Sequence, residues 1–231
     1  GHVNLELIVE KDESQPSGYR INLDILRENT RLMYEILDNA IDQNEFTLPI
    51  IEQTQKSTRK IGVGFMGLAN MLFKLELSYG SEEARDFVDN LLTSWEIESD
   101  EASFSKAERF GPFPNFHLSH HSQGRPKRNA IVRTLAPTGT TGFVAQTTGG
   151  MEPEYALAYT RTTVQGTSID LFNPVLEEKL AKYPFLRNEE ERRRFHSFIQ
   201  NNGNGSLQNF EINRKQESEE KFRIRQQNLA K

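Results

Sequence analysis

The 231-residue sequence contains no cysteine, which excludes disulfide bonds, cysteine metal sites and thiol chemistry within this chain. It also lacks an excess of basic residues: the formal net charge is −5, whereas a general nucleic-acid binder would show a basic face. No apolar run approaches the roughly 20 residues that are needed to span a bilayer. These absences predict that neither a membrane nor a nucleic acid is a partner.

Hydrophobic residues are also scarce, at 35% of the chain, and the mean hydropathy is −0.66. These values are typical of a protein with much exposed helix, or of a part whose remaining contacts lie elsewhere. The first residues, Gly1-His-Val-Asn-Leu-Glu6, show none of the basic and apolar pattern of a signal peptide, so we expect a cytoplasmic protein. The length allows one large domain or two small ones.

Helical spacing of apolar residues predicts helices over residues 24–44, 68–75, 81–110, 174–183 and 189–201. Asn22 or Asp24 is the expected N-cap of the first of these helices. Strands are expected over residues 128–134 and 155–164, and a polar connection over residues 50–60. The pattern indicates an α/β protein with far more helix than strand.

The stretch Leu135-Ala-Pro-Thr-Gly-Thr-Thr-Gly-Phe-Val144 follows a predicted strand and indicates a tight loop that leads into a helix. The first backbone N–H groups of a helix have no internal partner, and the helix dipole is positive at that end. The threonines at 138, 140 and 141 add hydroxyl donors, and the glycines at 139 and 142 let a ligand approach the backbone. The loop therefore suits a phosphate or diphosphate, although an ordinary N-cap and turn would use the same residue types.

Gly62-Val-Gly-Phe-Met-Gly67 matches the dinucleotide fingerprint G-x-G-x-x-G and is followed by an apolar helix. The fingerprint requires a buried strand before it, but the preceding Gln53-Thr-Gln-Lys-Ser-Thr-Arg-Lys60 is polar. Glu82 and Glu83 lie near the distance expected for the acidic residue, yet at the start of a helix. Close backbone packing of a short strand and a helix is therefore favoured over nicotinamide or flavin binding.

Two further groups of residues could have a chemical role. His117 and His121 have the i, i+4 spacing of a helical metal pair, with His120 beside them. The prolines and glycine around them indicate a solvated loop instead, so no metal site is predicted. Glu152 and Glu154 are acid/base candidates in a turn that enters a strand, but the sequence identifies no partner that would shift the pKa of either carboxyl.

Five motifs follow one another along the chain: Arg59-Lys-Ile-Gly-Val-Gly-Phe-Met-Gly-Leu-Ala-Asn70, Arg128-Asn-Ala130, Leu135-Ala-Pro-Thr-Gly-Thr-Thr-Gly142, Gly149-Gly-Met-Glu-Pro153 and Ala156-Leu-Ala-Tyr-Thr-Arg161. In this order they resemble the C-terminal half of the catalytic barrel of ribonucleotide reductase, in particular the adenosylcobalamin-dependent class II enzymes. Glu108-Arg-Phe-Gly-Pro-Phe-Pro114 and Leu37-Asp-Asn-Ala-Ile-Asp-Gln-Asn44 also fit that family. The resemblance covers about residues 1–178, and its last motif favours class II over class I.

The resemblance implies a ten-stranded α/β barrel of the ribonucleotide reductase and glycyl-radical type. Residues 1–202 would form part of this catalytic barrel domain, and residues 203–231 would be a polar segment that is exposed or depends on a partner. In the family, the Ala-Pro-Thr-Gly-Thr loop holds the diphosphate of the ribonucleotide substrate. The matching residues in this sequence are Pro137, Thr138, Gly139, Thr140 and Thr141.

The chain also departs from the family, whose chemistry needs a thiyl radical on a cysteine, a reducing cysteine pair, and an Asn and a Glu beside the radical cysteine. Because this chain has no cysteine, no catalytic residue is predicted in it, and it resembles a fragment that needs a complementary reductase part. The resemblance implies adenosylcobalamin, bound largely with that other part, a ribonucleoside diphosphate substrate, a thioredoxin-like reductant and an oligomer. A fragment of a class I large subunit and a non-catalytic phosphate-binding or assembly module are the alternatives.

Overall fold

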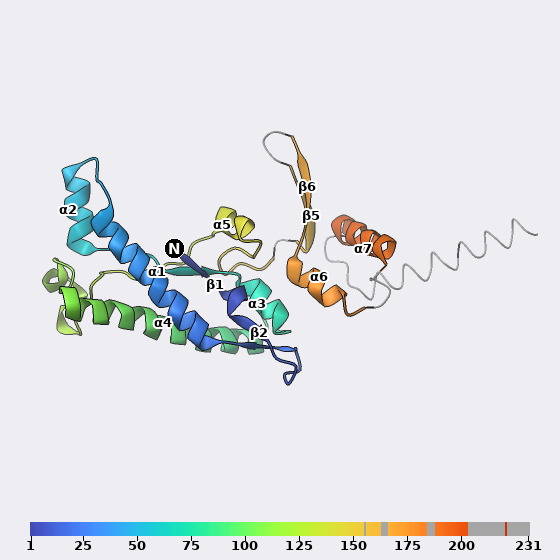
Figure 1. Ribbon diagram of the computed structural model, residues 1–231, viewed down its shortest axis with the longest axis horizontal. Helices are drawn as coiled ribbons and strands as arrows, with labels where there is room; N and C mark the ends of the chain where they lie inside the picture. Colours follow the sequence, from blue (N-terminus) through green and yellow to red (C-terminus); the bar gives the residue numbers. More distant parts are fainter. Residues whose placement is uncertain (155, 163–165, 184–187, 203–219, 221–231) are drawn as a thin grey trace, which may run out of the picture. The chain divides into compact units, whose positions relative to one another are not determined.

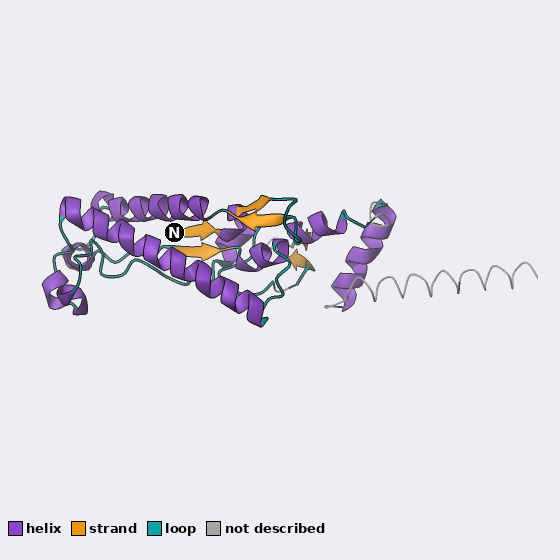
Figure 2. Ribbon diagram, turned by 90° about the horizontal axis from the view of Figure 1, so that it is seen from below, coloured by secondary structure: helices purple, strands orange, loops and turns teal. Residues whose placement is uncertain are grey.

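The computed structural model describes residues 1–154, 156–162, 166–183, 188–202 and 220. The chain divides into two compact units, Gly1–Glu154 and Tyr155–Lys231, here called the first and the second unit. Figure 1 follows the chain through its helices and strands, and Figure 2 distinguishes helix from strand by colour. The described part of each unit is a helix-rich α/β structure, as the sequence pattern predicts.

The helices of the first unit are α1 (Leu23–Gln43), α2 (Pro49–Thr58), α3 (Leu68–Lys74), α4 (Glu82–Phe110) and α5 (Gly139–Val144), with 3-10 turns η1 (Leu5–Ile8), η2 (Phe116–Leu118) and η3 (His120–Gln123). Asn22 caps α1, because its side-chain oxygen accepts from two N–H groups of the first turn. Ser81 caps α4 in the same way. The three helices predicted for this unit are confirmed. None of the described helices combines the length and the apolar character needed to cross a membrane.

The polar connection predicted over residues 50–60 is wrong, because α2 occupies most of it. Pro49 takes the first helical position, where its missing N–H leaves no bond unmade. The helix has no buried residue, so it lacks the apolar stripe by which a sequence pattern reveals a helix. It ends at Arg59, which has left-handed backbone angles (φ 47°) and a buried side chain.

A short parallel ladder runs through the first unit. Strand β1 (His2–Asn4) pairs with β4 (Gly64–Met66), and Figure 2 shows the two arrows side by side. Val63, the residue just before β4, forms a parallel bridge to Arg133. Three segments that are far apart in the sequence therefore lie next to one another.

The strand predicted over residues 128–134 is reduced to that single bridge, so its predicted extent is wrong. The N–H of Arg128 donates to the carbonyl of Ser103, and the N–H of Ala130 donates to the carbonyl of Thr58. Because these two N–H groups bond to carbonyls of α4 and of the end of α2, they are not available to a strand ladder. No closed sheet is present among the described residues, and the ten-stranded barrel is not confirmed.

The main core of the first unit lies among α1, α3, α4 and the parallel strands. Its buried side chains are Val3, Leu5, Ile8, Leu26, Phe65, Leu68, Met71, Leu72, Ala84, Leu91 and Trp95. Phe65 in β4 meets the indole of Trp95 edge to face, with 5.4 Å between the ring centroids. An antiparallel pair, β2 (Val9–Lys11) and β3 (Tyr19–Ile21), packs partly buried side chains against this core.

The second unit contains an antiparallel pair, β5 (Ala158–Thr162) and β6 (Ser168–Phe172), and two helices, α6 (Pro174–Leu180) and α7 (Glu189–Asn202). Its own core consists of Ala158, Leu180, Phe195 and Ile199. The strand and both helices predicted for this unit are confirmed at their described residues. The predicted polar segment over residues 203–231 lies outside the described residues, apart from Glu220, and the domain boundary after residue 202 stays a prediction.

Candidate functional site

The candidate phosphate loop lies between Arg133 and α5. Thr138 precedes the helix with left-handed backbone angles (φ 50°, ψ 29°). Its side chain is buried, and its hydroxyl oxygen accepts a hydrogen bond from the N–H of Gly150 at 2.7 Å. Thr138 therefore shapes the turn and ties the start of α5 to the glycine pair that follows this helix.

The other predicted site residues lie at the surface: Pro137, Gly139, Thr140 and Thr141 are exposed. The N–H groups of residues 139–141 are the first three of α5, so the helix itself offers them no acceptor. A Cβ atom at position 139 would meet no atom within 4 Å, so the space beside this backbone is open. An anion can therefore approach these N–H groups and the two exposed threonine hydroxyls together.

The glycines of the G-x-G-x-x-G segment lie in close packing, as predicted, but at Gly62 and Gly64 the close neighbours are Thr134 and His2 and not a helix. A Cβ atom at Gly62 would lie 2.7 Å from Cγ2 of Thr134, and one at Gly64 would lie 2.8 Å from the carbonyl oxygen of Thr134. Gly67 has φ +80° at the corner between β4 and α3, a conformation that favours glycine. The segment before it is α2 and not a strand, so the context of a dinucleotide site is missing.

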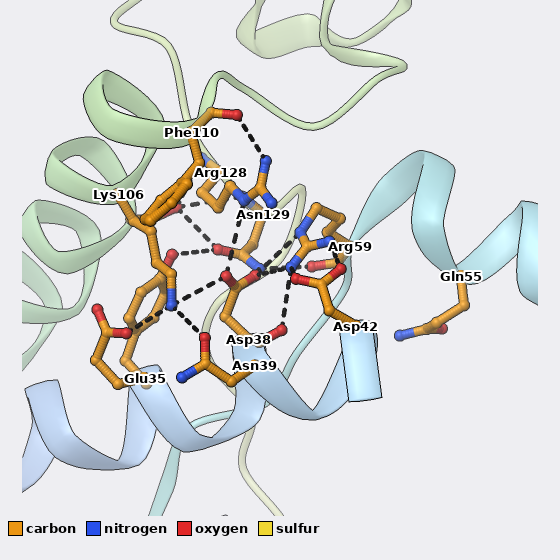
Figure 3. Close-up of polar contacts among 12 residues, drawn as sticks. Glu35, Asp38, Asn39, Asp42, Gln55, Arg59, Lys106, Phe110, Arg128 and Asn129 are labelled. Atoms are coloured by element: carbon orange, nitrogen blue, oxygen red, sulfur yellow. Dashed lines mark hydrogen bonds and ion pairs between the residues drawn. The ribbon is translucent and has the colours of Figure 1, made fainter. Parts of the chain in front are cut away.

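A buried ionic cluster between α1, α4, the end of α2 and residues 128–129 is a feature that the sequence did not reveal (Figure 3). It comprises Tyr34, Asp38, Arg59, Lys106, Arg128 and Asn129. The carboxylate of Asp38 accepts from Arg59 Nη2 at 2.8 Å and from Asn129 Nδ2 at 2.8 Å. Its other oxygen lies 3.3 Å from Lys106 Nζ. Asp38 is therefore the common partner of groups from three separate segments.

The electrostatics of this ionic cluster follow from burial and pairing. Burial raises the pKa of the Tyr34 phenol, which remains a hydrogen-bond donor to Asn129. The hydrogen bond from Arg59, 2.7 Å long, holds the pKa of Asp42 below its ordinary value of 3.8. Because its charges pair with one another, the cluster cross-links α1, α4 and the 128–130 segment, and we assign it a structural role.

The remaining candidates lie apart from the loop in the sequence. The rings of His120 and His121 lie close together in η3, with 3.9 Å between their centroids and a tilt of 43° between their planes, and His117 belongs to the separate turn η2. Within the described ranges, no three histidine, aspartate or glutamate side chains are grouped so that they could hold a metal ion. Glu152 is exposed and Glu154 half-buried in the turn that follows the glycine pair.

Comparison of the sequence with known proteins identifies the family of this chain. The family model "Ribonucleotide reductase, barrel domain" matches residues 1–127 and 125–228. The chain is 36% identical over 197 residues to the vitamin B12-dependent ribonucleoside-diphosphate reductase of Thermoplasma acidophilum, covering 85% of this chain and 25% of that protein. The protein of the same name from Mycobacterium tuberculosis is 37% identical over 170 residues, covering 74% of this chain and 24% of that protein. The ribonucleoside-diphosphate reductase subunit alpha of Chlamydia pneumoniae is 24% identical over 204 residues, covering 72% of this chain and 19% of that protein.

The chain therefore belongs to the ribonucleotide reductase barrel-domain family. This membership confirms the resemblance that the ordered motifs predict. The chain spans about a quarter of the length of the two B12-dependent relatives.

Proposed function

We propose that this chain is the substrate-phosphate-binding part of a vitamin B12-dependent ribonucleoside-diphosphate reductase, and that residues 137–141 hold the diphosphate of the substrate. The exposed start of α5 is the main support, because it offers three successive N–H groups without a helical acceptor beside two threonine hydroxyls. Identities of 36% and 37% to B12-dependent relatives, against 24% to the Chlamydia alpha subunit, favour this reading over the class I alternative.

In this proposal each loop residue has a role that follows from its place. The N–H groups of residues 139–141 and the dipole of α5 attract the phosphate oxygens. The hydroxyls of Thr140 and Thr141 donate to the same oxygens, and the open space beside Gly139 allows close approach. Pro137 and Thr138 hold the turn. The loop binds and orients the substrate, while the radical chemistry takes place on cysteines outside this chain.

Adenosylcobalamin supplies the initiating radical when it is bound to a reductase of this class. The described residues do not fit a cobalamin site by themselves. His120 and His121, whose ring nitrogens would be candidate cobalt ligands, lie against each other in the short turn η3, with 3.9 Å between their ring centroids. In this proposal the cofactor is therefore held by the complementary part, and no step is assigned to it on this chain.

The proposal is tested by anaerobic reduction of a ribonucleoside diphosphate, by this chain alone and together with the complementary cysteine-bearing part. Each reaction contains adenosylcobalamin and a dithiol or a thioredoxin-like reductant. We expect turnover in the mixture and none with this chain alone, because the chain has no cysteine. Turnover that requires a radical-generating protein in place of cobalamin would support the class I alternative. A verified complex that binds substrate without turnover would support a phosphate-binding or assembly module.

The site assignment is tested by Thr140→Ala, which removes one hydroxyl donor from the loop. We expect substrate binding in the mixture to weaken by about 1–3 kcal/mol, the scale of a hydrogen bond to a charged group. The measurement is the KM for the ribonucleoside diphosphate. Thr54→Ala, at an exposed threonine of α2, is the matched control and should leave KM unchanged. An unchanged KM for Thr140→Ala would remove this residue from the site.

A further inference from the structure

The carboxylate of Glu6 joins three segments of the first unit. Glu6 lies in η1, directly after β1. Its Oε2 accepts from Asn70 Nδ2 at 2.8 Å and from the hydroxyl of Thr147 at 2.7 Å. Its Oε1 lies 3.1 Å from Lys74 Nζ, and the side chains of Glu6 and Lys74 are only 12% and 16% exposed. One nearly buried carboxylate therefore connects the start of the chain, helix α3 and the segment that follows α5.

The corner between β4 and α3 is shaped around the same contact. A Cβ atom at Gly67 would lie 2.4 Å from Oδ1 of Asn4, 2.8 Å from the hydroxyl oxygen of Thr147 and 3.1 Å from the backbone nitrogen of Glu6. The N–H of Gly67 donates to the carbonyl of Thr148 at 2.8 Å. The last glycine of the G-x-G-x-x-G segment therefore leaves room both for the Asn4 side chain and for the Thr147 hydroxyl, which reaches Glu6.

Residues 147–150 also form hydrogen bonds with the candidate phosphate loop and with α5. The N–H of Thr147 donates to the carbonyl of Gly142 at 2.9 Å, and the N–H of Gly150 donates to the hydroxyl of Thr138 at 2.7 Å. A Cβ atom at Gly149 would lie 2.6 Å from the carbonyl oxygen of Pro137. The cap residue Thr138 and the carbonyl of Gly142 in α5 thus bond to one short segment, and Glu6 bonds to the same segment through the Thr147 hydroxyl.

We propose that Glu6 is a positioning residue for the phosphate loop and acts through the hydroxyl of Thr147. The inference rests on the proposed function of that loop. A hydrogen bond to a carboxylate is stronger than one between neutral groups, so it can fix the segment behind α5. The N–H groups of an anion site must be aimed closely at the ligand, and a small displacement of their support weakens binding. Glu6 itself does not bind the ligand, because its oxygens are already engaged and its charge repels a phosphate.

The test measures binding of inorganic pyrophosphate to the full 231-residue chain by calorimetry. Thr147→Val keeps the shape of the side chain but removes the hydroxyl, and we expect the Kd to rise roughly threefold to tenfold, the worth of one hydrogen bond. Thr147→Ser keeps a hydroxyl and should return the Kd to within about twofold of the original. Glu6→Gln should weaken binding as well, and the double variant should bind no more weakly than the weaker single variant, because both changes break one connection.

Tyr34→Phe is the matched control for a general loss of stability. It removes a buried hydroxyl hydrogen bond in the ionic cluster, far along the chain from α5, and should leave the Kd unchanged. A Thr147→Val chain that folds and binds pyrophosphate like the original would overturn the positioning role while leaving the phosphate site intact. An equal rise in Kd for Tyr34→Phe would also overturn it, because stability alone would then explain the effect. Failure of the unchanged chain to bind pyrophosphate would contradict the proposed function and this inference together.

Discussion

At the scale of single residues, the carboxylate of Asp38 is the most consequential side chain outside the loop. It is completely buried, and Arg59, at 4% exposure, is its partner. Asp38→Ala would remove the buried counter-charge that Arg59 and Lys106 share, and would leave each with one carboxylate partner at the surface. We expect the free energy of unfolding to fall by about 3–5 kcal/mol, the cost of removing one partner of a buried ion pair. Urea unfolding measures this change.

Asp24 provides the control for that prediction on the same helix. It pairs with Arg27 at 2.9 Å, but its side chain is almost fully exposed. Asp24→Ala should therefore change the free energy of unfolding by less than about 1 kcal/mol, because water screens an exposed pair. Equal effects of the two substitutions would contradict the structural role that we assign to the ionic cluster.

The pH dependence of stability is a second prediction at this scale. The hydrogen bond from Arg59 lowers the pKa of Asp42 in the folded chain below its ordinary value of 3.8. A carboxyl with a lowered folded-state pKa stabilises the protein above its ordinary pKa, and this contribution is lost as the pH falls through the folded-state pKa. Asp42→Asn should therefore show a shallower loss of stability below about pH 4 in urea titrations. The side chain is 47% exposed, so the difference should be small, and parallel curves would refute it.

At the scale of elements, the junction from β4 to α3 depends on a glycine for two separate reasons. Gly67 has φ +80°, and a Cβ there would crowd the Asn4 side chain and the Thr147 hydroxyl. Gly80 has φ +82°, yet nothing lies within 4 Å of the Cβ position. Gly80→Ala should cost about 1–2 kcal/mol from backbone strain alone. Gly67→Ala should cost distinctly more, as measured by thermal unfolding, and equal costs would show that the crowding is relieved without penalty.

At the scale of the whole molecule, the two units have separate cores. Trp95, the sole tryptophan of the chain, belongs to the core of the first unit, whereas Phe195 belongs to the core of the second. Phe195→Ala should destabilise the second unit by about 3–5 kcal/mol, the usual cost of truncating a buried phenylalanine. We expect loss of helical circular dichroism at lower urea, with an unchanged midpoint of Trp95 fluorescence. Leu91→Ala, in the core around Trp95, is the control and should shift the urea midpoint of the fluorescence change. If Phe195→Ala also shifts that midpoint, the prediction that each core loses its stability separately is wrong.

Features that depend on neighbouring residues could be predicted from the sequence. The starts of helices α1 and α4 could be predicted from their caps, Asn22 and Ser81, because a polar cap followed by apolar residues at helical spacing is a local signal. The packing role of the 62–67 glycines and the family resemblance of the ordered motifs also followed from short stretches of sequence. Helix α2 escaped prediction because it buries no side chain and therefore shows no apolar period.

Tertiary structure decided which distant groups meet. Asp38 and Asn129 are 91 positions apart, and Glu6 and Thr147 are 141 positions apart, so no local pattern could pair them. Contacts between distant residues also shortened the expected 128–134 strand, because the N–H groups of Arg128 and Ala130 bond to α4 and to the end of α2. The sequence by itself determined the helices that bury an apolar face and the family, and it predicts the chemistry of the loop. The buried partners of its charges were decided only by the fold, because a charged side chain finds its counter-ion in space and not along the chain.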